Sequence, residues 1–212
     1  MAERNGQLQL FVDAAFAAFD HCASDAEARR SVLQIFSRLQ TPGEQRQGEG
    51  GQLPACLHLS TALAIETGSD QLRQMITRFQ AMEPRLIWRR RENSSGTSSG
   101  NFEEGHANAM IIGPGGLEER SDVWIGVTLM APGVRYPYHD HAPEEVYLVL
   151  SEGEFQHGTS QWFSPGVGGS FYNPPGIKHA MRSVDTPLFA FWALLADRTP
   201  MEREFGSTQE QP

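Results

Sequence analysis

Cysteines and long apolar runs are scarce in this sequence. Its 212 residues include two cysteines, Cys22 and Cys56, which are too few for a disulfide scaffold or a thiolate metal site. No apolar stretch approaches the roughly 20 residues that a membrane span requires. The first ten residues are largely polar and lack the basic and then apolar pattern of a signal peptide. We therefore expect a cytoplasmic protein without a membrane partner, whose two thiols are free and buried.

Positive charge is scarce as well. The chain has 17 Lys and Arg residues against 26 Asp and Glu residues, which gives a formal net charge of −9. Contacts to nucleic-acid phosphates need a basic face, so this balance argues against a nucleic-acid partner. The length suits one domain with a sizeable core. The oligomeric state stays open, with a homodimer as one option.

The first 84 residues carry a helical pattern. Apolar residues recur at helical spacing over residues 8–19, which predicts a helix with one apolar face. Ser24 to Glu27 reads S-D-A-E, a capping box that predicts the start of a second helix. Further helices are expected at about 54–66 and 70–82, and Pro84 ends the last one. Between them, residues 44–52 are predicted to form an exposed loop.

The pattern changes to a period of two after a Ser- and Gly-rich stretch. Residues 86–90 are predicted to form a first strand, and 92–105 a flexible loop. From residue 107 on, short alternating strands are separated by Gly and Pro turns, which is typical of a double-sheet jelly-roll barrel. We therefore expect a helical N-terminal region (1–84), a mainly β barrel (85–200) and a C-terminal tail (201–212).

The segment 133–147 concentrates metal-binding side chains. His139 and His141 are two residues apart, so on an extended segment their side chains point to the same side. Glu145 has the same parity, and Tyr147 follows it by two. Charged groups inside a small barrel are costly unless they are paired or bound to a metal. A divalent ion would account for this grouping.

A second segment supplies a further donor. Residues 168–179 read G-G-S-F-Y-N-P-P-G-I-K-H, in which a turn at Pro174 to Gly176 leads into a strand carrying His179. Three histidines and one carboxylate suit one divalent transition metal: Zn, Fe, Mn, Co or Ni. The remaining histidines, His21, His58, His106 and His157, are interpreted as surface or structural residues.

These two segments resemble the two sequence motifs of the cupin superfamily. The first matches the H-x-H-x3-E pattern at His139, His141 and Glu145, and the second matches G-x5-P-x-G-x2-H up to His179. The sequence departs from these motifs at two points. In the first motif, the spacing after Glu145 is one residue longer than usual. In the second motif, Ser183 stands in place of the usual Asn. Neither departure involves a ligand. The resemblance implies a metal-binding cupin barrel, against the alternative of a metal-free storage cupin.

A narrower resemblance involves two tyrosines. The string Y-x2-H-x-H-x3-E-x-Y from Tyr136 to Tyr147 is similar to the cupin-type dimethylsulfoniopropionate (DMSP) lyases of marine bacteria, the group of DddL, DddQ, DddK and DddW, and is nearest to DddL. It implies β-elimination of a small-molecule substrate to dimethyl sulfide and acrylate. This chemistry requires a Lewis-acidic metal and one base. Tyr147 is the favoured base, because it lies two residues past a ligand and a nearby cation favours the phenolate; Tyr136 is the rival.

The same resemblance implies a pocket for a sulfonium cation. Aromatic faces attract such a group, and the candidates are Trp192 first, then Tyr138, Trp124 and Phe171. Each of the four could instead be an ordinary core residue. Arg135 and Lys178 flank the motifs and are interpreted as solvated charges.

Two other functions use the same sequence features. An Fe(II) dioxygenase acting on a small carboxylate or thiol would need the same ligands, but it does not require the paired tyrosines. A non-catalytic cupin sensor joined to a DNA-binding helical segment is the third option. Residues 1–83 contain 7 Arg, no Lys and 10 Asp plus Glu, a net charge of −3, which is the wrong sign for binding DNA.

Overall fold

The helices of the computed structural model begin where the sequence supplies capping side chains. The structure describes residues 3–91 and 96–196. The Asn5 side chain caps α1 (Gly6–Cys22) by accepting a hydrogen bond from the backbone of Gln7, and Ser69 caps α4 (Asp70–Met82) in the same way. The cap of α2 (Ala26–Arg38) is Asp25, which accepts from Ala28. The predicted capping box with Ser24 is therefore wrong by one residue, and the Ser24 hydroxyl instead donates to the Ser170 carbonyl.

The other segments of the N-terminal half are shorter than predicted. The expected helix at 54–66 is a 3-10 turn, η1 (Pro54–His58), followed by α3 (Leu59–Leu63). Another 3-10 turn, η2 (Glu83–Arg85), follows α4, and the first barrel strand is β2 (Trp88–Arg89). The predicted loop at 44–52 contributes a short strand, β1 (Glu44–Gln45), and the predicted loop at 92–105 ends in α5 (Phe102–Gly105). Residues 92–95 and the tail at 201–212 lie outside the described residues.

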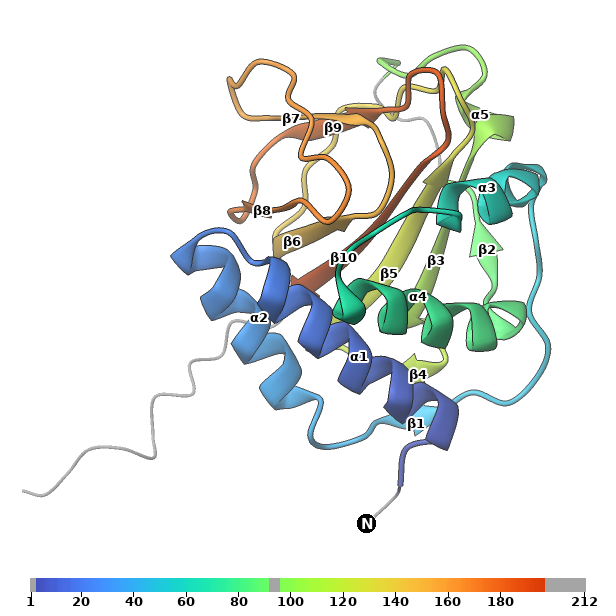
Figure 1. Ribbon diagram of the computed structural model, residues 1–212, viewed down its shortest axis with the longest axis vertical. Helices are drawn as coiled ribbons and strands as arrows, with labels where there is room; N and C mark the ends of the chain where they lie inside the picture. Colours follow the sequence, from blue (N-terminus) through green and yellow to red (C-terminus); the bar gives the residue numbers. More distant parts are fainter. Residues whose placement is uncertain (1–2, 92–95, 197–212) are drawn as a thin grey trace, which may run out of the picture.

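The barrel consists of a large sheet and a small one (Figure 1). The large sheet has the order β1-β4-β3-β5-β10-β6-β8, with β2 paired to β3, and the small sheet pairs β7 with β9. Apart from β1 and β2, the strands are β3 (His106–Ile112), β4 (Glu118–Glu119), β5 (Val123–Met130), β6 (Glu144–Val149), β7 (Glu154–His157), β8 (Ser170–Asn173), β9 (His179–Arg182) and β10 (Leu188–Leu195). The last strand in sequence, β10, thus lies between β5 and β6 near the middle of the sheet.

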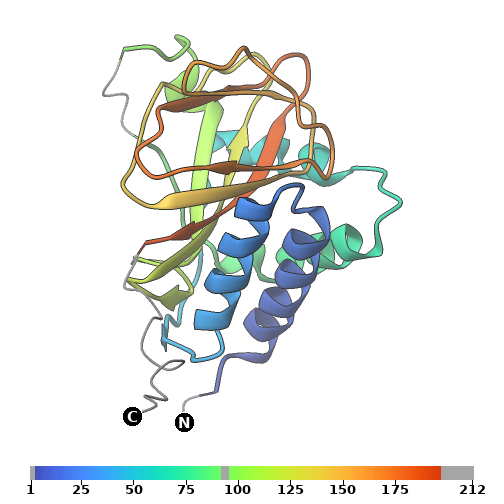
Figure 2. The ribbon, with the colours of Figure 1, turned by 90° about the vertical axis from the view of Figure 1, so that its left-hand side faces the viewer.

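Helices cover one face of the large sheet, which we call its outer face. Figure 2 shows α1 and α2 packed side by side below the barrel. The ring of Phe191 on β10 lies 6.0 Å from that of Phe11 on α1 and 5.2 Å from that of Phe79 on α4. One apolar cluster therefore joins the helices to the outer-face residues of the central strands, among them Val127, Leu148, Phe189, Phe191 and Ala193.

The opposite, inner face of the large sheet faces β7 and β9 and has its own apolar cluster. That cluster contains Tyr147, Phe155, Met181 and Leu188, with Trp192 packed against it. Successive residues of a strand point to opposite faces. Phe191 and Trp192, next to each other on β10, therefore belong to different clusters, as the alternating pattern predicts.

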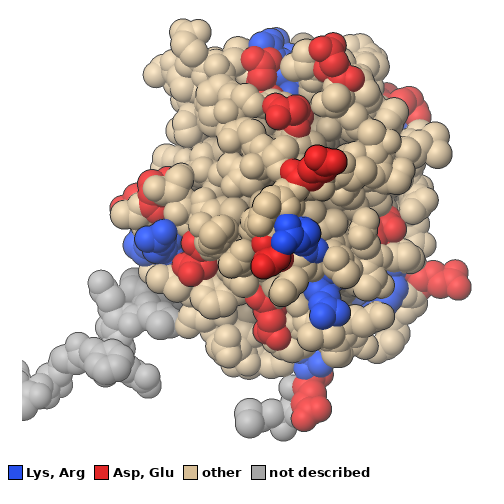
Figure 3. Space-filling view, viewed as in Figure 1, with Lys and Arg blue, Asp and Glu red and all other residues tan. Residues whose placement is uncertain are grey.

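Charges on the helical face are mixed in sign. In Figure 3, Lys and Arg side chains lie singly among Asp and Glu. Arg30 pairs with Glu27 on α2, and Arg73 pairs with Asp70 on α4, each three residues apart. Among residues 3–91 and 96–196, no helix combines the length and the apolar character that a membrane span needs.

Candidate metal centre and substrate cavity

Strand β6 places Glu145 and Tyr147 on the inner face. Glu145 lies opposite Leu194 of β10 and Asn173 of β8, and Tyr147 lies opposite Trp192 and Phe171. Val146 and Leu148, between and beyond them, are buried in the outer-face cluster. The sequence prediction that a carboxylate and a phenol share one face of this strand is therefore confirmed.

The two motifs are joined to each other by backbone hydrogen bonds. His139 and His179 form an antiparallel bridge, in which each backbone N–H donates to the other residue's carbonyl at 3.0 and 2.8 Å. The Gly176 N–H, in the turn before β9, donates to the His141 carbonyl at 2.9 Å. Gly176 has a φ of +71°, a conformation that glycine adopts without strain. Segments about 40 residues apart in sequence thus meet at one point of the barrel.

Ligand atoms of His141, Glu145 and His179 converge there. One potential donor atom from each of the three lies within 4.8 Å of the other two. A Glu145 carboxylate oxygen is 3.4 Å from His141 Nε2 and 3.3 Å from His179 Nε2. His139 lies beside this group of three, with its ring centre 4.0 Å from that of His179. In the part of the chain that the structure describes, these three residues form the one such group.

Hydrogen bonds to the backbone orient all three imidazoles. The Nδ1 atoms of His139, His141 and His179 lie 3.0, 2.9 and 3.0 Å from the carbonyl oxygens of Pro137, Pro143 and Ile177. A carbonyl only accepts, so each Nδ1 carries the proton and each Nε2 keeps a lone pair. The buried Nε2 of His179 makes no hydrogen bond, although a Glu145 oxygen lies 3.3 Å away. A metal ion would satisfy this atom, so the residues fit a divalent cation.

The surroundings shift the pKa values of the candidate ligands in different directions. Burial, with the charges of His179 and Arg91, lowers the pKa of His139 from 6.5 to about 3, so this imidazole is neutral near pH 7. Burial opposes ionisation of Glu145, but the nearby imidazoles outweigh it and lower the pKa of the carboxyl group. Burial likewise opposes the charged form of His141, and Glu145 outweighs it, so the pKa of His141 is raised.

Asn173 connects the carboxylate to a histidine outside the centre. Its side-chain Nδ2 donates to a Glu145 oxygen at 3.2 Å, and its Oδ1 lies 2.7 Å from His157 Nδ1. The Asn173 side chain is fully buried. The Glu145 oxygen that accepts from Asn173 is the same one that lies near His141 and His179. The structural role predicted for His157 agrees with the contact, but the sequence did not indicate Asn173, because its position opposite Glu145 comes from the β6–β8 register.

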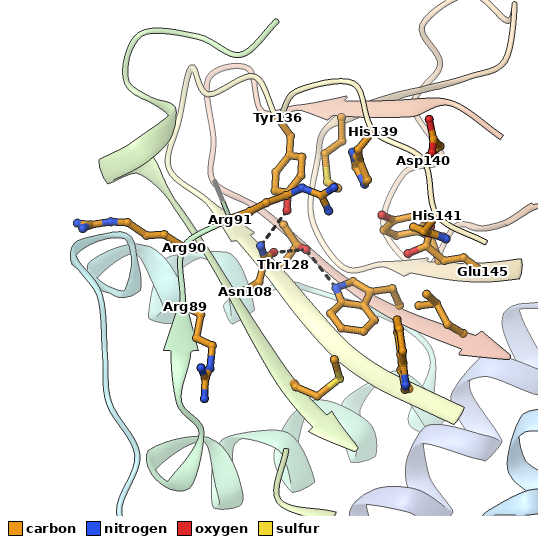
Figure 4. A pocket seen from close by; sticks show the side chains of 16 residues that line it. Arg89, Arg90, Arg91, Asn108, Thr128, Tyr136, His139, Asp140, His141 and Glu145 are labelled. Carbon is orange, nitrogen blue, oxygen red and sulfur yellow. Dashed lines mark hydrogen bonds and ion pairs between the residues drawn. The ribbon is translucent and has the colours of Figure 1, made fainter. Parts of the chain in front are cut away.

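A cavity of about 370 Å³ opens beside the three ligands (Figure 4). Tyr136 and Tyr147 both line it. Burial and the Glu145 charge raise the pKa of Tyr147 well above 10. Burial also raises the pKa of Tyr136, although Arg91 and a hydrogen bond from Asn108 oppose the rise. Without an added cation, both phenols are therefore protonated near neutral pH.

A chain of hydrogen bonds fixes the Tyr136 side of the cavity. Trp192 Nε1 donates to Thr128 Oγ1 at 3.1 Å, Thr128 Oγ1 donates to Asn108 Oδ1 at 2.7 Å, and Asn108 Nδ2 donates to the Tyr136 oxygen at 2.9 Å (Figure 4). The Tyr136 oxygen thus accepts, and its own proton is directed elsewhere. Gly126 makes room for Trp192, because an added Cβ would lie 2.2 Å from the indole.

Two of the four aromatic residues predicted to line the pocket do so. Trp124 and Trp192 line the cavity. Phe171 lies elsewhere and stacks on the Tyr147 ring at 5.0 Å. Tyr138 is also outside the cavity: its hydroxyl donates to Gln156, and its ring lies under Arg135 and Lys178. The predictions for Phe171 and Tyr138 are corrected in this way, because parity gives the face of a strand but not the depth of the barrel at which a side chain lies.

Several lining residues were not predicted from the sequence. Asn108, Met110, Thr128, Met181 and the arginines at 89–91 line the cavity together with the motif residues. Among these, only the run of three arginines, which begins inside the predicted first strand, is a visible signal in the sequence. Ser183, the departure from the second motif, accepts from the Val134 N–H at 2.9 Å and donates to the Ala131 carbonyl. It ties the end of β9 to the turn before the histidines.

A family model described as dimethylsulfoniopropionate lyase matches residues 27–190, which is more than three quarters of the chain. The chain belongs to the DMSP lyase family. The family is one of carbon–sulfur lyases, and the resemblance read from the two motifs and the paired tyrosines is thereby confirmed.

Individual members of the DMSP lyase family resemble this chain to different extents. It is 33% identical over 91 residues to dimethylsulfoniopropionate lyase DddQ of Ruegeria pomeroyi, a match that covers 42% of this chain and 45% of that protein. The crystal structure of DddQ from the same organism has a TM-score of 0.69 at 24% identity, over 93% of this chain and 95% of that one. A structure from the work on the DMSP lyases RdDddP and RnDddQII has a TM-score of 0.67 at 21% identity, covering 89% and 92%. At these identities the structures show a shared fold, and the predicted cupin barrel with an N-terminal helical region is confirmed.

Proposed function

We propose that this protein cleaves DMSP to dimethyl sulfide and acrylate by β-elimination. The observation that carries the proposal is the convergence of His141, Glu145 and His179, with His139 beside them, on a cavity lined by two tyrosines. Membership of the DMSP lyase family supports the substrate. The aromatic residues Trp124 and Trp192 provide faces for a sulfonium cation.

A divalent transition metal would be held by Nε2 of His139, His141 and His179 and by the Glu145 carboxylate. When bound, it supplies Lewis acidity that stabilises negative charge on a substrate carboxylate and favours ionisation of nearby phenols. The protein contributes the orientation of its ligands through the three Nδ1–carbonyl hydrogen bonds. It also excludes water, since Glu145 and His179 are each 3% exposed.

Tyr147 is the proposed base. Its side chain lies on the same face as Glu145, and its ring contacts those of Phe171 and Phe155. Its high pKa in the metal-free protein means that the phenolate would be a strong base once formed. Tyr136 is the rival, since its oxygen already accepts a hydrogen bond from Asn108 and the same bond would stabilise a phenolate.

The elimination balances without a redox partner or a general acid. The phenolate oxygen takes a proton from the carbon next to the substrate carboxylate. The electron pair of that C–H bond forms the C=C bond of acrylate, and the C–S bond breaks with its pair on sulfur. Dimethyl sulfide leaves as a neutral molecule, so the leaving group needs no proton.

The proposal is tested by reconstituting metal-free protein separately with Zn, Fe, Mn, Co and Ni. Each preparation is incubated with DMSP under anaerobic conditions, and dimethyl sulfide and acrylate are measured. Equal amounts of both products with at least one metal are expected. Absence of both with all five metals would overturn the proposal. Oxygen consumption by the iron form without these products would point instead to the dioxygenase.

The base is tested by comparing Tyr147→Phe with Tyr136→Phe. A positioned base typically contributes about 100- to 10,000-fold to the rate, so Tyr147→Phe is expected to lose activity on that scale. Its metal content should stay unchanged, as measured by mass spectrometry of the metal. An active Tyr147→Phe beside an inactive Tyr136→Phe would assign the base to Tyr136.

A further inference from the structure

Arg91 is the least expected residue of the cavity. It lies just after β2, in a chain that has 17 basic residues in total, and it lines the cavity together with the ligands. Its side chain extends toward Tyr136 and His139, whereas those of Arg89 and Arg90 point away from them (Figure 4). The guanidinium carbon lies 6.0 Å from the centre of the Tyr136 ring.

A buried histidine holds the backbone of Arg91 in place. The Arg91 N–H donates to His106 Nε2 at 2.8 Å, and the Nδ1 of this imidazole bonds to the Phe102 carbonyl. The His106 ring is fully buried and stacks on that of Phe102 at 3.7 Å. Burial lowers the pKa of His106, which keeps its Nε2 free to accept. The position of the arginine at the cavity is therefore set by the core.

The Arg91 guanidinium has no acidic partner among the described residues. Arg90, its neighbour, pairs with Glu104 at 2.7 Å. The acidic residues of the cavity wall are Asp140 and Glu145, and Glu145 is engaged by His141, His179 and Asn173. The positive charge of Arg91 contributes to the lowered pKa of His139 and of His179. This part of the cavity thus presents a cation to any ligand.

Much of the remaining cavity wall is apolar and aromatic. It includes Met110, Trp124, Met181, Trp192 and Leu194. Aromatic faces and thioether sulfurs suit a soft organic cation. A ligand with a carboxylate at one end and a charged sulfur at the other would therefore be bound in one direction only, because Arg91 repels the sulfur end.

We propose that Arg91 binds the substrate carboxylate, so that the site selects ligands that carry a carboxylate at one end and a soft cation at the other. The guanidinium offers a planar pair of donors that matches a carboxylate. This inference rests on the proposed lyase function and adds the residue that selects the substrate. Arg91 orients the carboxylate, while the proton transfer belongs to the tyrosines.

The first test measures binding without turnover. Propionate and its neutral isostere propionamide are titrated into metal-free and metal-loaded protein and followed by ligand-observed NMR. The wild type is expected to prefer propionate. Arg91→Met should lower the affinity for propionate about tenfold and leave the binding of propionamide unchanged. A tenfold loss is at the low end for removing hydrogen bonds to a charged group, because Arg91 is exposed to solvent. Equal propionate affinity in the wild type and Arg91→Met would overturn the proposal.

The second test uses DMSP turnover. Arg91→Met should raise KM about tenfold with kcat changed less than KM, and Arg91→Lys, which keeps the charge but not the donor pair, should lie between. Arg73→Met is the matched control, since Arg73 is a surface residue of α4 paired with Asp70; its KM should equal that of the wild type. An unchanged KM in Arg91→Met alone overturns the carboxylate role and leaves the lyase proposal standing. Propionate binding that depends on Arg91, without any cleavage of DMSP, would support the carboxylate role of Arg91 and overturn the lyase proposal.

Discussion

The two faces of β10 are both buried but differ in chemistry. On the outer face, Phe189 and Phe191 are 0% exposed and contact rings of the helices. On the inner face, Trp192 donates a hydrogen bond to Thr128 and lines the cavity together with the proposed metal ligands. Burial therefore does not distinguish packing from function here. The difference is that the outer face presents only carbon, while the inner face presents donors and acceptors whose partners are specified.

The largest effect is expected from an inner-face change that keeps the shape of the side chain. Glu145→Gln removes the carboxylate charge from the proposed ligand set and keeps similar size. Loss of metal-ion catalysis is worth several kcal/mol, so kcat/KM for DMSP should fall about 1,000-fold or more. Metal content should fall as well, while the melting temperature of the metal-free protein should stay close to that of the wild type.

The control for this variant is Glu152→Gln, which makes the same chemical change at an exposed position. It should keep full activity and metal content. A Glu145→Gln protein that still binds one metal per chain and turns over DMSP at the wild-type rate would contradict the proposed ligand set.

The outer face should respond in the opposite way. Phe191→Ala leaves a cavity between β10 and the helices α1 and α4, and Phe→Ala changes in cores cost about 3–5 kcal/mol. Urea unfolding should show this loss in the free energy of unfolding. The kcat/KM of the protein that remains folded should change by less than about threefold, because the Phe191 side chain lies on the face of β10 opposite the cavity. A loss of activity far beyond the loss of folded protein would show that the two faces are not separable.

A smaller effect is expected from the residue behind the carboxylate. Asn173→Ala removes the hydrogen bond that orients Glu145. Partners of this kind typically change metal affinity by about 10- to 100-fold, and we expect the low end, because Glu145 keeps its contacts with two imidazoles. Competition with a chelator measures the affinity. Asn101→Ala, a change at an exposed asparagine, serves as the control and should leave the affinity unaltered.

The smallest effect concerns pH. Because burial lowers the pKa of His139 from 6.5 to about 3, the unfolded chain binds a proton at this residue before the folded chain does. The stability that this difference provides is complete above about pH 6.5 and is lost as the pH falls toward 3. The lowered pKa of His179 acts in the same direction. Urea unfolding of metal-free protein at several pH values should show that the free energy of unfolding falls as the pH is lowered. His139→Gln should make this dependence on pH weaker.

The stability cost of Phe191→Ala should show no such pH dependence. The outer face of β10 carries no titratable group, since it consists of Phe189, Phe191, Ala193 and Leu195. A cost that varies with pH would mean that the outer-face packing is coupled to the histidines.

The sequence predicts the parts of this site that follow from local spacing. The parity of His139, His141, Glu145 and Tyr147 is a property of an extended chain, and it correctly separates the inner from the outer face of β6. Arg91 and Asn108 could not be found in this way. They reach the cavity because β2 pairs with β3, with Arg89 opposite Asn108. The local sequence of a segment does not predict which distant segment it will pair with. Phe171 and Tyr138 lie outside the cavity for a different reason, because parity does not give the depth of the barrel at which a side chain lies.

The position of β10 has a consequence for how the protein is made. This strand comes after all the other described strands in sequence, yet it pairs with both β5 and β6. During synthesis on the ribosome, β5 and β6 must therefore wait with unpaired edges until residues 188–195 have emerged. The helices also wait, because Phe11 and Phe79 pack on the last strand. A nascent chain that stalls before residue 188 would expose these edges together with the apolar side of α1 and α4, which makes it a substrate for chaperones rather than a partly active enzyme.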